Sequence, residues 1–348
     1  PNNITNIGKE AFLGTAWYNN QSDGMVFAGK VLYGYKGVMP ENTSIEIPFG
    51  TISIGNSAFY DCSNLTNVTI PNSVKYIGKR AFQNCTKIDN ILIPDSVTAI
   101  GDSAFKYCTS IDNFVIPNSV TTIGENIFGH CSSLKNIIIS DSITDISYGT
   151  FSDCTNLEDI AIPDGVTNIG EYAFYGCENL KNINIPNGVK SIKESTFNGC
   201  KSLINITIPE KVTNIGDYAF TDCESLVSLV IPNSVTSILE SAFDGCKNLT
   251  IMGYKNSVAE NYAKENEINF IELIKKIITG DADENEIVDV NDVTYLQRHI
   301  AGNKNTDELP LIDESNKDVF ESVDLNKDGK LDVQDVTLLQ QLVAGNKE

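Results

Sequence analysis

Several features are scarce or absent in this sequence, and each absence excludes a class of protein. The sequence has no run of about 18 apolar residues, so we expect no membrane-spanning helix. Basic residues number 25 against 46 acidic ones, and a formal net charge of −21 makes nucleic acid an unsuitable partner. This charge leaves two interpretations open, a solvated acidic surface or the binding of cations.

Histidine occurs only twice. His130 occupies a variable turn position before a repeat cysteine and His299 lies on a predicted helix, and neither has a credible serine or cysteine nucleophile in the pattern. A glycosidase needs two opposed carboxylates in a cleft, and a regular repeat offers no unique pair of this kind. We therefore expect that this chain is not an enzyme and has no catalytic residues.

A 23-residue repeat organises most of the chain. A phenylalanine lies three residues before each cysteine, and leucine or isoleucine lies three residues after it. The cysteines that mark the period are Cys62, Cys85, Cys108, Cys131, Cys154, Cys177, Cys200, Cys223 and Cys246. A fixed period of about 20 to 29 residues with apolar positions in register predicts a leucine-rich-repeat solenoid.

The apolar spacing within one coil predicts its path. Residues 65–70 approach the alternation of a half-buried strand, and Pro71 ends that strand because it has no N–H to donate. Gly78 takes a corner, after which Phe82 and Cys85 fill the opposite wall. A single coil cannot bury these faces alone, so we expect neighbouring coils to stack their strands into one parallel sheet.

The cysteines are odd in number and occupy equivalent inward positions. We expect a buried ladder of unpaired thiols. Some paired bridges remain an alternative, whereas a metal site lacks support because no C-x-x-C occurs.

Residues 1–272 resemble the leucine-rich-repeat family of bacterial surface antigens of the BspA type. The resemblance rests on the repeated pattern I-G-x-x-A-F-x-x-C-x-x-L-x-x-[IV]-x-I-P-x-x-V. Two clear copies are residues 77–97, in the variant with Arg80, and residues 169–189. It implies a scaffold for binding or adhesion, with no chemistry specified.

The two ends of the solenoid depart from the repeat. Residues 13–37 hold Trp17 and Tyr33 and read as an aromatic hairpin insertion, either a cover for the open end or a platform for a sugar or protein ligand. Residues 255–272 read as a C-terminal cap with a serine-capped helix and a last strand, and residues 273–278 as a linker. Because Pro1 opens directly onto half a coil, we expect the chain to be a processed product.

One outward strand position carries Leu92, Val115 and Ile138 in consecutive coils, which predicts a continuous exposed apolar stripe. Such a stripe favours a protein partner, although β-propensity alone also explains apolar residues on a sheet.

The last 71 residues form a different, acidic segment, with 17 acidic and 6 basic residues and therefore a net charge of −11, against −10 for the rest. Two 12-residue segments, 281–292 and 324–335, lie 43 residues apart and carry oxygen ligands at loop positions 1, 3, 5, 7, 9 and 12, where position 7 contributes its carbonyl. These residues are Asp281, Asp283, Asn285, Ile287, Asp289 and Asp292 in the first loop and Asp324, Asn326, Asp328, Lys330, Asp332 and Asp335 in the second. The spacing predicts two calcium ions.

Each loop is followed by one amphipathic helix and has Asp at position 12, and with the duplication this makes residues 279–348 similar to a type I dockerin. Glu286 departs from the family, which has glycine at position 6, whereas Gly329 retains it. The resemblance implies a small all-α calcium-binding domain that binds a cohesin module of a scaffoldin. By the same resemblance the cohesin contacts are Val290, Asn291, Gln297 and Arg298 in the first copy and Val333, Gln334, Gln340 and Gln341 in the second.

Two functions remain open after this reasoning. The first is a non-catalytic binding or adhesion subunit of an extracellular cellulosome at a bacterial cell surface, with the repeats as a protein- or glycan-binding surface. The second is a spacer within a longer polysaccharide-degrading enzyme whose catalytic domain lies outside this chain.

Overall fold

The computed structural model describes residues 7–8, 10–273, 279–282, 288–302, 312 and 317–345. The predicted calcium ligands Asp283, Asn285 and Ile287 lie outside these residues. The chain divides into two compact units, Pro1–Leu273 and Ile274–Glu348.

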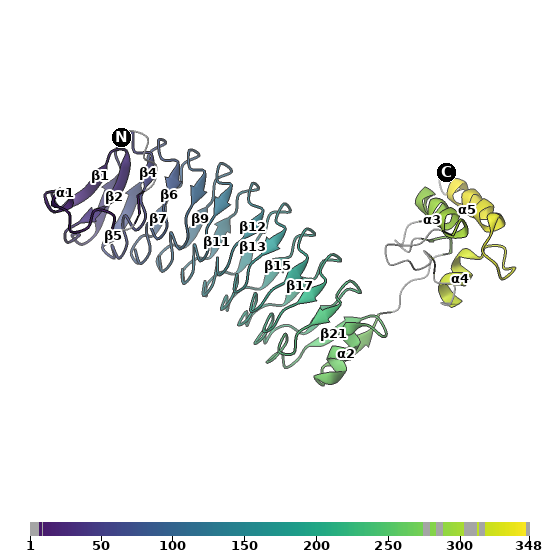
Figure 1. Cartoon of the computed structure of the whole chain (residues 1–348). Coiled ribbons are helices and arrows are strands. Elements are labelled where there is room, and N and C mark those ends of the chain that lie inside the picture. Colours follow the sequence, from purple (N-terminus) through teal and green to yellow (C-terminus); the bar gives the residue numbers. More distant parts are fainter. Residues whose placement is uncertain are drawn as a thin grey trace. The chain divides into compact units, whose positions relative to one another are not determined.

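The first unit is a solenoid of stacked coils (Figure 1). Each coil contributes one strand to each of two rows, rather than to the single parallel sheet that we expected. The first strand row comprises β3 (Thr43–Glu46), β5 (Leu65–Thr69), β7 (Asn90–Ile91), β9 (Asn113–Val115), β11 (Asn136–Ile138), β13 (Asp159–Ile160), β15 (Asn182–Asn184), β17 (Asn205–Thr207), β19 (Ser228–Val230), β21 (Thr250–Gly253) and β22 (Asn269–Glu272). The second strand row comprises β4 (Ser53–Ile54), β6 (Tyr76–Ile77), β8 (Ala99–Ile100), β10 (Thr122–Ile123), β12 (Asp145–Ile146), β14 (Asn168–Ile169), β16 (Ser191–Ile192), β18 (Asn214–Ile215) and β20 (Ser237–Ile238).

Pairing between neighbouring coils is parallel and in register with the repeat. Asn67 pairs with Asn90 in the first strand row, and Ala99 pairs with Thr122 in the second, so partners are one 23-residue period apart. The predicted 23-residue coil is therefore confirmed. The second strand row was missed because a strand of two residues is too short to have a recognisable alternation.

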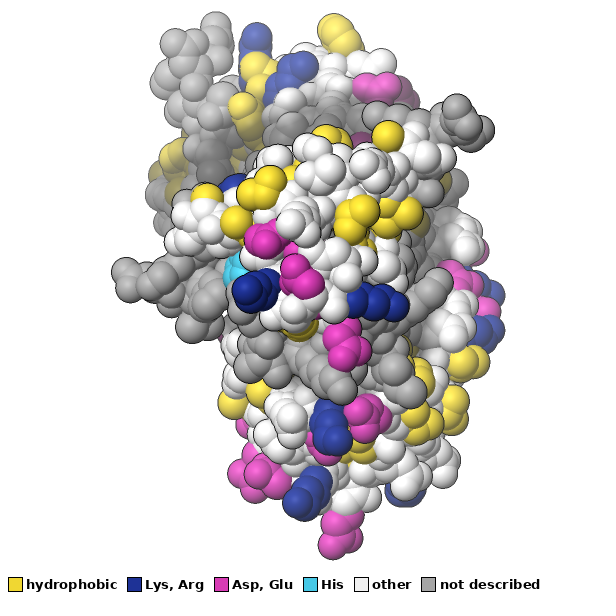
Figure 2. All heavy atoms as spheres, turned by 90° about the vertical axis from the view of Figure 1, so that its right-hand side faces the viewer, with side chains coloured by type: hydrophobic (Ala, Val, Ile, Leu, Met, Phe, Trp, Pro, Cys, Tyr) yellow, Lys and Arg dark blue, Asp and Glu magenta, His cyan; other side chains and the backbone are white. Residues whose placement is uncertain are grey.

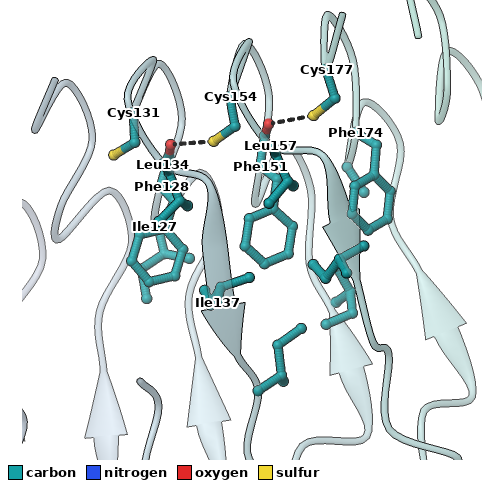
Figure 3. Packing of buried hydrophobic residues seen from close by; sticks show 14 of the residues in the cluster. Ile127, Phe128, Cys131, Leu134, Ile137, Phe151, Cys154, Leu157, Phe174 and Cys177 are labelled. Carbon is teal, nitrogen blue, oxygen red and sulfur yellow. Dashed lines mark hydrogen bonds between the residues drawn. The ribbon is translucent and has the colours of Figure 1, made fainter. Parts of the chain in front are cut away.

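The core contains a continuous stack of phenylalanine rings, part of which Figure 3 shows. The rings of consecutive coils lie nearly parallel, with centroids 5.2 to 5.9 Å apart. The stack runs through Phe59, Phe82, Phe105, Phe128, Phe151, Phe174, Phe197, Phe220 and Phe243, all buried. Burial of each ring contributes about 1.5–3 kcal/mol before the entropy of ordering the chain is counted.

The cysteines lie beside this stack, and all nine are free thiols. From Cys85 to Cys246, each thiol donates a hydrogen bond of 3.0 to 3.3 Å to the carbonyl oxygen of the phenylalanine 26 residues earlier (Figure 3). A buried carbonyl without a partner is costly, so these thiols have a polar role as well as an apolar one.

Both ends of the solenoid are covered. At the first end, β1 (Gly24–Ala28) and β2 (Val31–Lys36) form an antiparallel hairpin, β2 pairs with β4, and the short helix α1 (Ala16–Asn19) precedes the hairpin. At the other end, α2 (Val258–Glu265) begins with Ser257 as its N-cap, as the sequence predicts, and β22 pairs with β21. The ring of Tyr262 in α2 packs edge-on against Phe243 at 5.7 Å, and so closes the phenylalanine stack.

The second unit contains three described helices, α3 (Val290–Ile300), α4 (Lys317–Val323) and α5 (Val333–Gly345). Its core includes Leu296 from α3, Val323 from α4 and Leu339 from α5, all fully buried. Helix α4 was not predicted from the sequence. Within the described residues, no helix has the length and apolar character needed to cross a membrane.

Helices α3 and α5 begin at loop position 10, three residues earlier than the sequence analysis expected. Asp289 caps α3, and it forms a reciprocal capping box with Asp292, which satisfies N–H groups that a helix start leaves free. The last three loop positions therefore belong to the first turn of each helix.

Candidate functional site

The second predicted calcium loop is organised by carboxylates that accept hydrogen bonds from the loop backbone. The two carboxylate oxygens of Asp324 accept from the N–H of Asp328 at 3.2 Å and of Gly329 at 3.0 Å. Gly329 has a φ of +82°, a conformation that glycine adopts without a steric penalty. Asn326 and Asp328 accept from the N–H groups of Asp328 and Lys330, both at 2.9 Å.

Asp335, at loop position 12, joins the two ends of the same loop. One carboxylate oxygen accepts from Leu325 N–H at 2.9 Å, and the other accepts from Asp332 N–H at 2.9 Å. The residue is fully buried although it carries a carboxylate. Its contacts hold loop positions 2 and 9 beside the first turn of α5.

The described part of the first loop has the same arrangement. Asp292 accepts from Ala282 N–H and from Asp289 N–H, both at 2.7 Å, which are the contacts that Asp335 makes at the equivalent positions. Asp289 in turn accepts from Asn291 N–H at 2.6 Å, as Asp332 accepts from Gln334 N–H at 2.7 Å. Two segments 43 residues apart in sequence thus share one geometry.

The donor set of the second loop fits a hard cation. The side chains at loop positions 1, 3, 5, 9 and 12 all carry oxygen, and Lys330 at position 7 offers its backbone carbonyl. Oxygen is the ligand atom that Ca²⁺ prefers over nitrogen or sulfur. Asp324 is 5% exposed and Asp335 is 0% exposed, so a bound cation would neutralise charge where water reaches poorly. In the described part of the chain, no three Asp, Glu, His or Cys side chains converge as a complete metal site, so any ion there needs amide, carbonyl or water oxygens as well.

The helices that follow the loops present apolar residues to solvent. Val290 at the start of α3 is 61% exposed, and Val333 at the start of α5 is 68% exposed. The other predicted cohesin contacts are also exposed, namely Asn291, Gln297, Arg298, Gln334, Gln340 and Gln341. Helices α3 and α5 contact each other, and therefore the two predicted sets belong to one packed pair of helices.

The predicted apolar stripe on the first strand row is exposed as expected. Leu92, Val115 and Ile138 are 75%, 46% and 64% exposed, and Val115 pairs directly with Ile138 between β9 and β11. Beside the stripe, Asn136 donates its side-chain amide to Asn113 at 2.8 Å. Asn113 and Asn136 thus bond to each other from one coil to the next, beside the apolar stripe.

In the next coils, the large apolar side chains of the stripe give way to smaller or polar ones, and these line an open hollow of about 520 Å³. Its lining includes Asp159, Ala161, Asn182, Asn184, Asn205 and Thr207. The apolar surface formed by Leu92, Val115 and Ile138 is therefore bounded on this side.

The aromatic residues of the N-terminal insertion mostly pack against each other. Trp17 lies 4.7 Å from the ring of Phe12 and 6.1 Å from that of Tyr33, whose hydroxyl oxygen accepts from Phe12 N–H at 3.0 Å. Trp17 still exposes 38% of its surface. These contacts favour the role of an end cover, and they leave part of the indole accessible to a ligand.

The two histidines have structural partners. His130 stacks on Tyr107 with centroids 4.4 Å apart, and its Nδ1 lies 3.2 Å from a carboxylate oxygen of Asp153. Burial lowers the pKa of His130, while Asp153 acts in the opposite direction. His299 accepts a hydrogen bond of 3.1 Å from Ile312 N–H. In these contacts neither histidine is paired with a serine or cysteine nucleophile.

Charged groups of both signs are spread over the surface. Figure 2 shows Asp and Glu, Lys and Arg, and hydrophobic side chains interspersed on one face. Several ion pairs link successive coils, such as Lys181 to Glu158 at 2.8 Å and Lys201 to Glu178 at 2.7 Å. Exposed pairs of this kind contribute little stability, about 0–1 kcal/mol each.

A further hollow on the second strand row was not anticipated. It has a volume of about 400 Å³ and is lined in part by Ser53, Tyr76, Lys79, Ala99, Asp102 and Thr122. The signal that could have revealed it is a departure from the repeat, because Tyr76 and Lys79 occupy positions where other coils have different kinds of side chain.

The repeats match a family model described as BspA type leucine rich repeat region, in six copies over residues 35–158 and 146–269. This match covers more than half of the chain. The chain belongs to this family. The match ends before the second unit begins.

Solved structures with similar coils include a T. pallidum leucine rich repeat protein, with 29% identity, a TM-score of 0.41, and coverage of 56% of this chain and 82% of that one. A leucine rich cell surface protein from Faecalibacterium prausnitzii has 27% identity and a TM-score of 0.34, with coverage of 78% and 87%. A leucine-rich repeat protein from Bacteroides ovatus has 27% identity and a TM-score of 0.36, with coverage of 67% and 84%. No curated protein matches the chain.

Proposed function

We propose that this chain is a non-catalytic binding or adhesion subunit of an extracellular cellulosome. The C-terminal unit attaches it to a cohesin in a calcium-dependent manner, and the repeats present a binding surface. The observation that carries the proposal is the shared arrangement of the loops, in which Asp292 and Asp335 make equivalent backbone contacts 43 residues apart.

Calcium would act at the loops by holding carboxylates together. Asp324, Asn326 and Asp328 with the Lys330 carbonyl would ligate one ion in the second loop. The buried carboxylate of Asp335 sets the end of the loop against α5. Because like charges repel when no ion is present, binding of the ion would be coupled to the order of this unit.

Exposed residues on α3 and α5 support the cohesin contact. Val290 and Val333 are large apolar side chains with more than half of their surface in solvent, at equivalent places in two copies. Burial of such residues against a partner is favourable. Since the copies are nearly equivalent, with Arg298 in one and Gln341 in the other, either copy can serve as the main contact.

Titration calorimetry of the intact chain against a panel of cohesins, with calcium and then with chelator, tests the attachment. We expect calcium-dependent binding that is weakened in Asp281→Ala and Asp324→Ala. Lys327→Ala is the matched control, because it lies in the second loop at position 4, which contributes no ligand. Absence of binding to every cohesin, by a protein shown to hold calcium, would exclude the cellulosome.

The helix contacts have a separate test. Each of the single variants Val290→Asp and Val333→Asp changes one copy and leaves the other intact, so each should retain cohesin binding. The double variant should lose it. Equal loss in one single variant and in the double variant would mean that only one copy is used.

The repeat surface formed by Leu92, Val115 and Ile138 supports binding of a protein ligand, since large apolar side chains are exposed at the same position of three consecutive coils. Trp17 and Tyr33 are the alternative, as a sugar platform. A glycan array probed with wild type and with a Trp17→Ala, Tyr33→Ala double variant tests this alternative, because loss of the sugar signal in the variant would assign the sugar contact to these two rings.

A second candidate is that the repeats are a spacer within a longer polysaccharide-degrading enzyme. The regular coil stack, which connects an N-terminal cover to the C-terminal unit, is compatible with that role. Sequencing of the complete gene would decide between them, because a spacer requires a catalytic domain elsewhere in the product.

A further inference from the structure

The outward position of the second strand row is occupied by small or polar residues in all coils but one. The row reads Ser53, Tyr76, Ala99, Thr122, Asp145, Asn168, Ser191, Asn214 and Ser237. Tyr76 pairs with Ser53 on one side and with Ala99 on the other. Both neighbours have small side chains, and Tyr76 is 43% exposed. Among the described residues, no second aromatic ring packs on it.

A second departure lies in the same coil. The position two residues after the isoleucine of each strand in the second row reads Asn56, Lys79, Asp102, Glu125, Tyr148, Glu171, Glu194, Asp217 and Glu240, of which six are acidic. Lys79 is the single cation of this series. Its ammonium lies 2.6 Å from a carboxylate oxygen of Asp102 in the next coil. A tyrosine and a lysine that both break the repeat thus lie in one coil.

These residues surround the hollow of about 400 Å³ described above. Tyr76 forms an aromatic wall, Ala99 leaves the space next to it free, and Lys79 and Asp102 form a polar rim with Thr122. The volume falls within the range of about 300–1,000 Å³ that is typical of small-molecule sites. An aromatic wall with a few convergent polar groups is also typical of such sites.

We propose that this hollow binds a neutral pyranose unit of an oligosaccharide, stacked on Tyr76 and hydrogen-bonded by Lys79 and Asp102. The apolar face of a pyranose ring matches an exposed tyrosine ring. Its neighbouring hydroxyl groups both donate and accept, and they match a carboxylate and an ammonium that lie side by side. The ion pair has no net charge, which favours a neutral sugar over an anion. This site lies on the other strand row from Leu92, Val115 and Ile138, so it does not depend on the function proposed above.

The test is titration of the full chain with neutral cello-, xylo-, manno- and chito-oligosaccharides, observed by saturation-transfer NMR and calorimetry. We expect binding of at least one of them to wild type. Loss of the aromatic contact in Tyr76→Ala should weaken it by about tenfold, which corresponds to about 1.4 kcal/mol. Tyr76→Phe keeps the ring and should bind nearly as wild type.

Tyr218→Ala is the matched control, because Tyr218 is also 43% exposed and does not line the hollow. Ala99→Leu fills the space beside the ring while retaining Tyr76, and it should abolish binding. Unchanged thermal stability of Ala99→Leu would show that the loss comes from the site and not from unfolding.

Several results would overturn the proposal. They are no binding of any neutral oligosaccharide to wild type, equal affinity of Tyr76→Ala and wild type, or equal losses in Tyr76→Ala and Tyr218→Ala. Tighter binding of an oligogalacturonate than of every neutral sugar would also overturn it, because that would require an uncompensated cation in the hollow.

Discussion

The thiol of Cys154 donates a hydrogen bond of 3.2 Å to the carbonyl oxygen of Phe128, one coil and three residues earlier in the chain. The same bond recurs from Cys85 to Cys246. It links each coil to the preceding one through a side chain that is buried beside the phenylalanine stack. Cysteine therefore supplies a small apolar volume and a donor at one position.

This bond predicts that Cys154→Ala destabilises the solenoid beyond the loss of a sulfur atom. The change leaves a small void and a buried carbonyl without its donor, and the free energy of unfolding should fall by about 2 kcal/mol. Urea denaturation followed by circular dichroism measures it. Cys62→Ala is the control, since Cys62 is only half-buried, and a loss as large as that of Cys154→Ala would contradict this account.

Alkaline pH should destabilise the solenoid through its thiols. Burial raises the pKa of Cys131 from 9.0 to about 12. Above about pH 9 the unfolded chain loses thiol protons that the folded chain retains, so the stability that is present below this pH is lost as pH rises. Unfolding free energies measured from about pH 8 to about pH 10.5 should fall less steeply in Cys131→Ala than in wild type. Identical slopes would refute the assignment.

At Gly170, the backbone of the preceding coil comes too close to leave room for a side chain. A Cβ on Gly170 would lie 2.6 Å from the backbone nitrogen of Tyr148 in the preceding coil, so Gly170→Ala should cost about 3 kcal/mol. Gly165 lies in the same coil, but a Cβ there would meet nothing closer than 3.7 Å, and Gly165→Ala should be nearly neutral. Thermal unfolding of the two variants measures the difference, and equal midpoints would argue against it.

Adjacent strand residues should respond oppositely to charge. Ile137 is 7% exposed and Ile138 is 64% exposed in the same strand. Ile137→Lys buries an unpaired charge and should cost about 3 kcal/mol or more, whereas Ile138→Lys should change stability by less than about 0.5 kcal/mol. Urea denaturation of both variants checks the prediction. A large loss in Ile138→Lys would mean that this side chain is covered.

Removal of calcium should affect one unit only. If the loops hold calcium, chelator should lower the unfolding temperature of the C-terminal unit and leave the solenoid transition unchanged, because binding stabilises only the part that binds. Differential scanning calorimetry resolves the two transitions. In Asp324→Ala the effect of chelator should be smaller than in wild type. A chelator effect on the solenoid transition, or none on either, would count against the calcium loops.

Much of this molecule was predictable because its coils repeat. Each coil has the same surroundings as its neighbours, so a residue type that recurs every 23 residues, such as Phe128 or Cys154, must face the core in every copy. Outward positions followed from the same alternation, and the exposure of Leu92 and Ile138 confirms them. The helix cap at Ser257 followed from local chemistry alone.

Only the tertiary structure decided the features that depend on contacts between coils. The two-residue strands of the second row have no periodicity of their own and form because a neighbouring coil offers hydrogen-bond partners. The bond from Cys154 to Phe128 joins residues 26 apart, and no local pattern indicates it. The hollow beside Tyr76 exists because Ala99 is its neighbour in space, 23 residues away in sequence. The repeat determines which side chains face inward. The neighbours of a residue that departs from the repeat, such as Tyr76, are determined only when the coils stack.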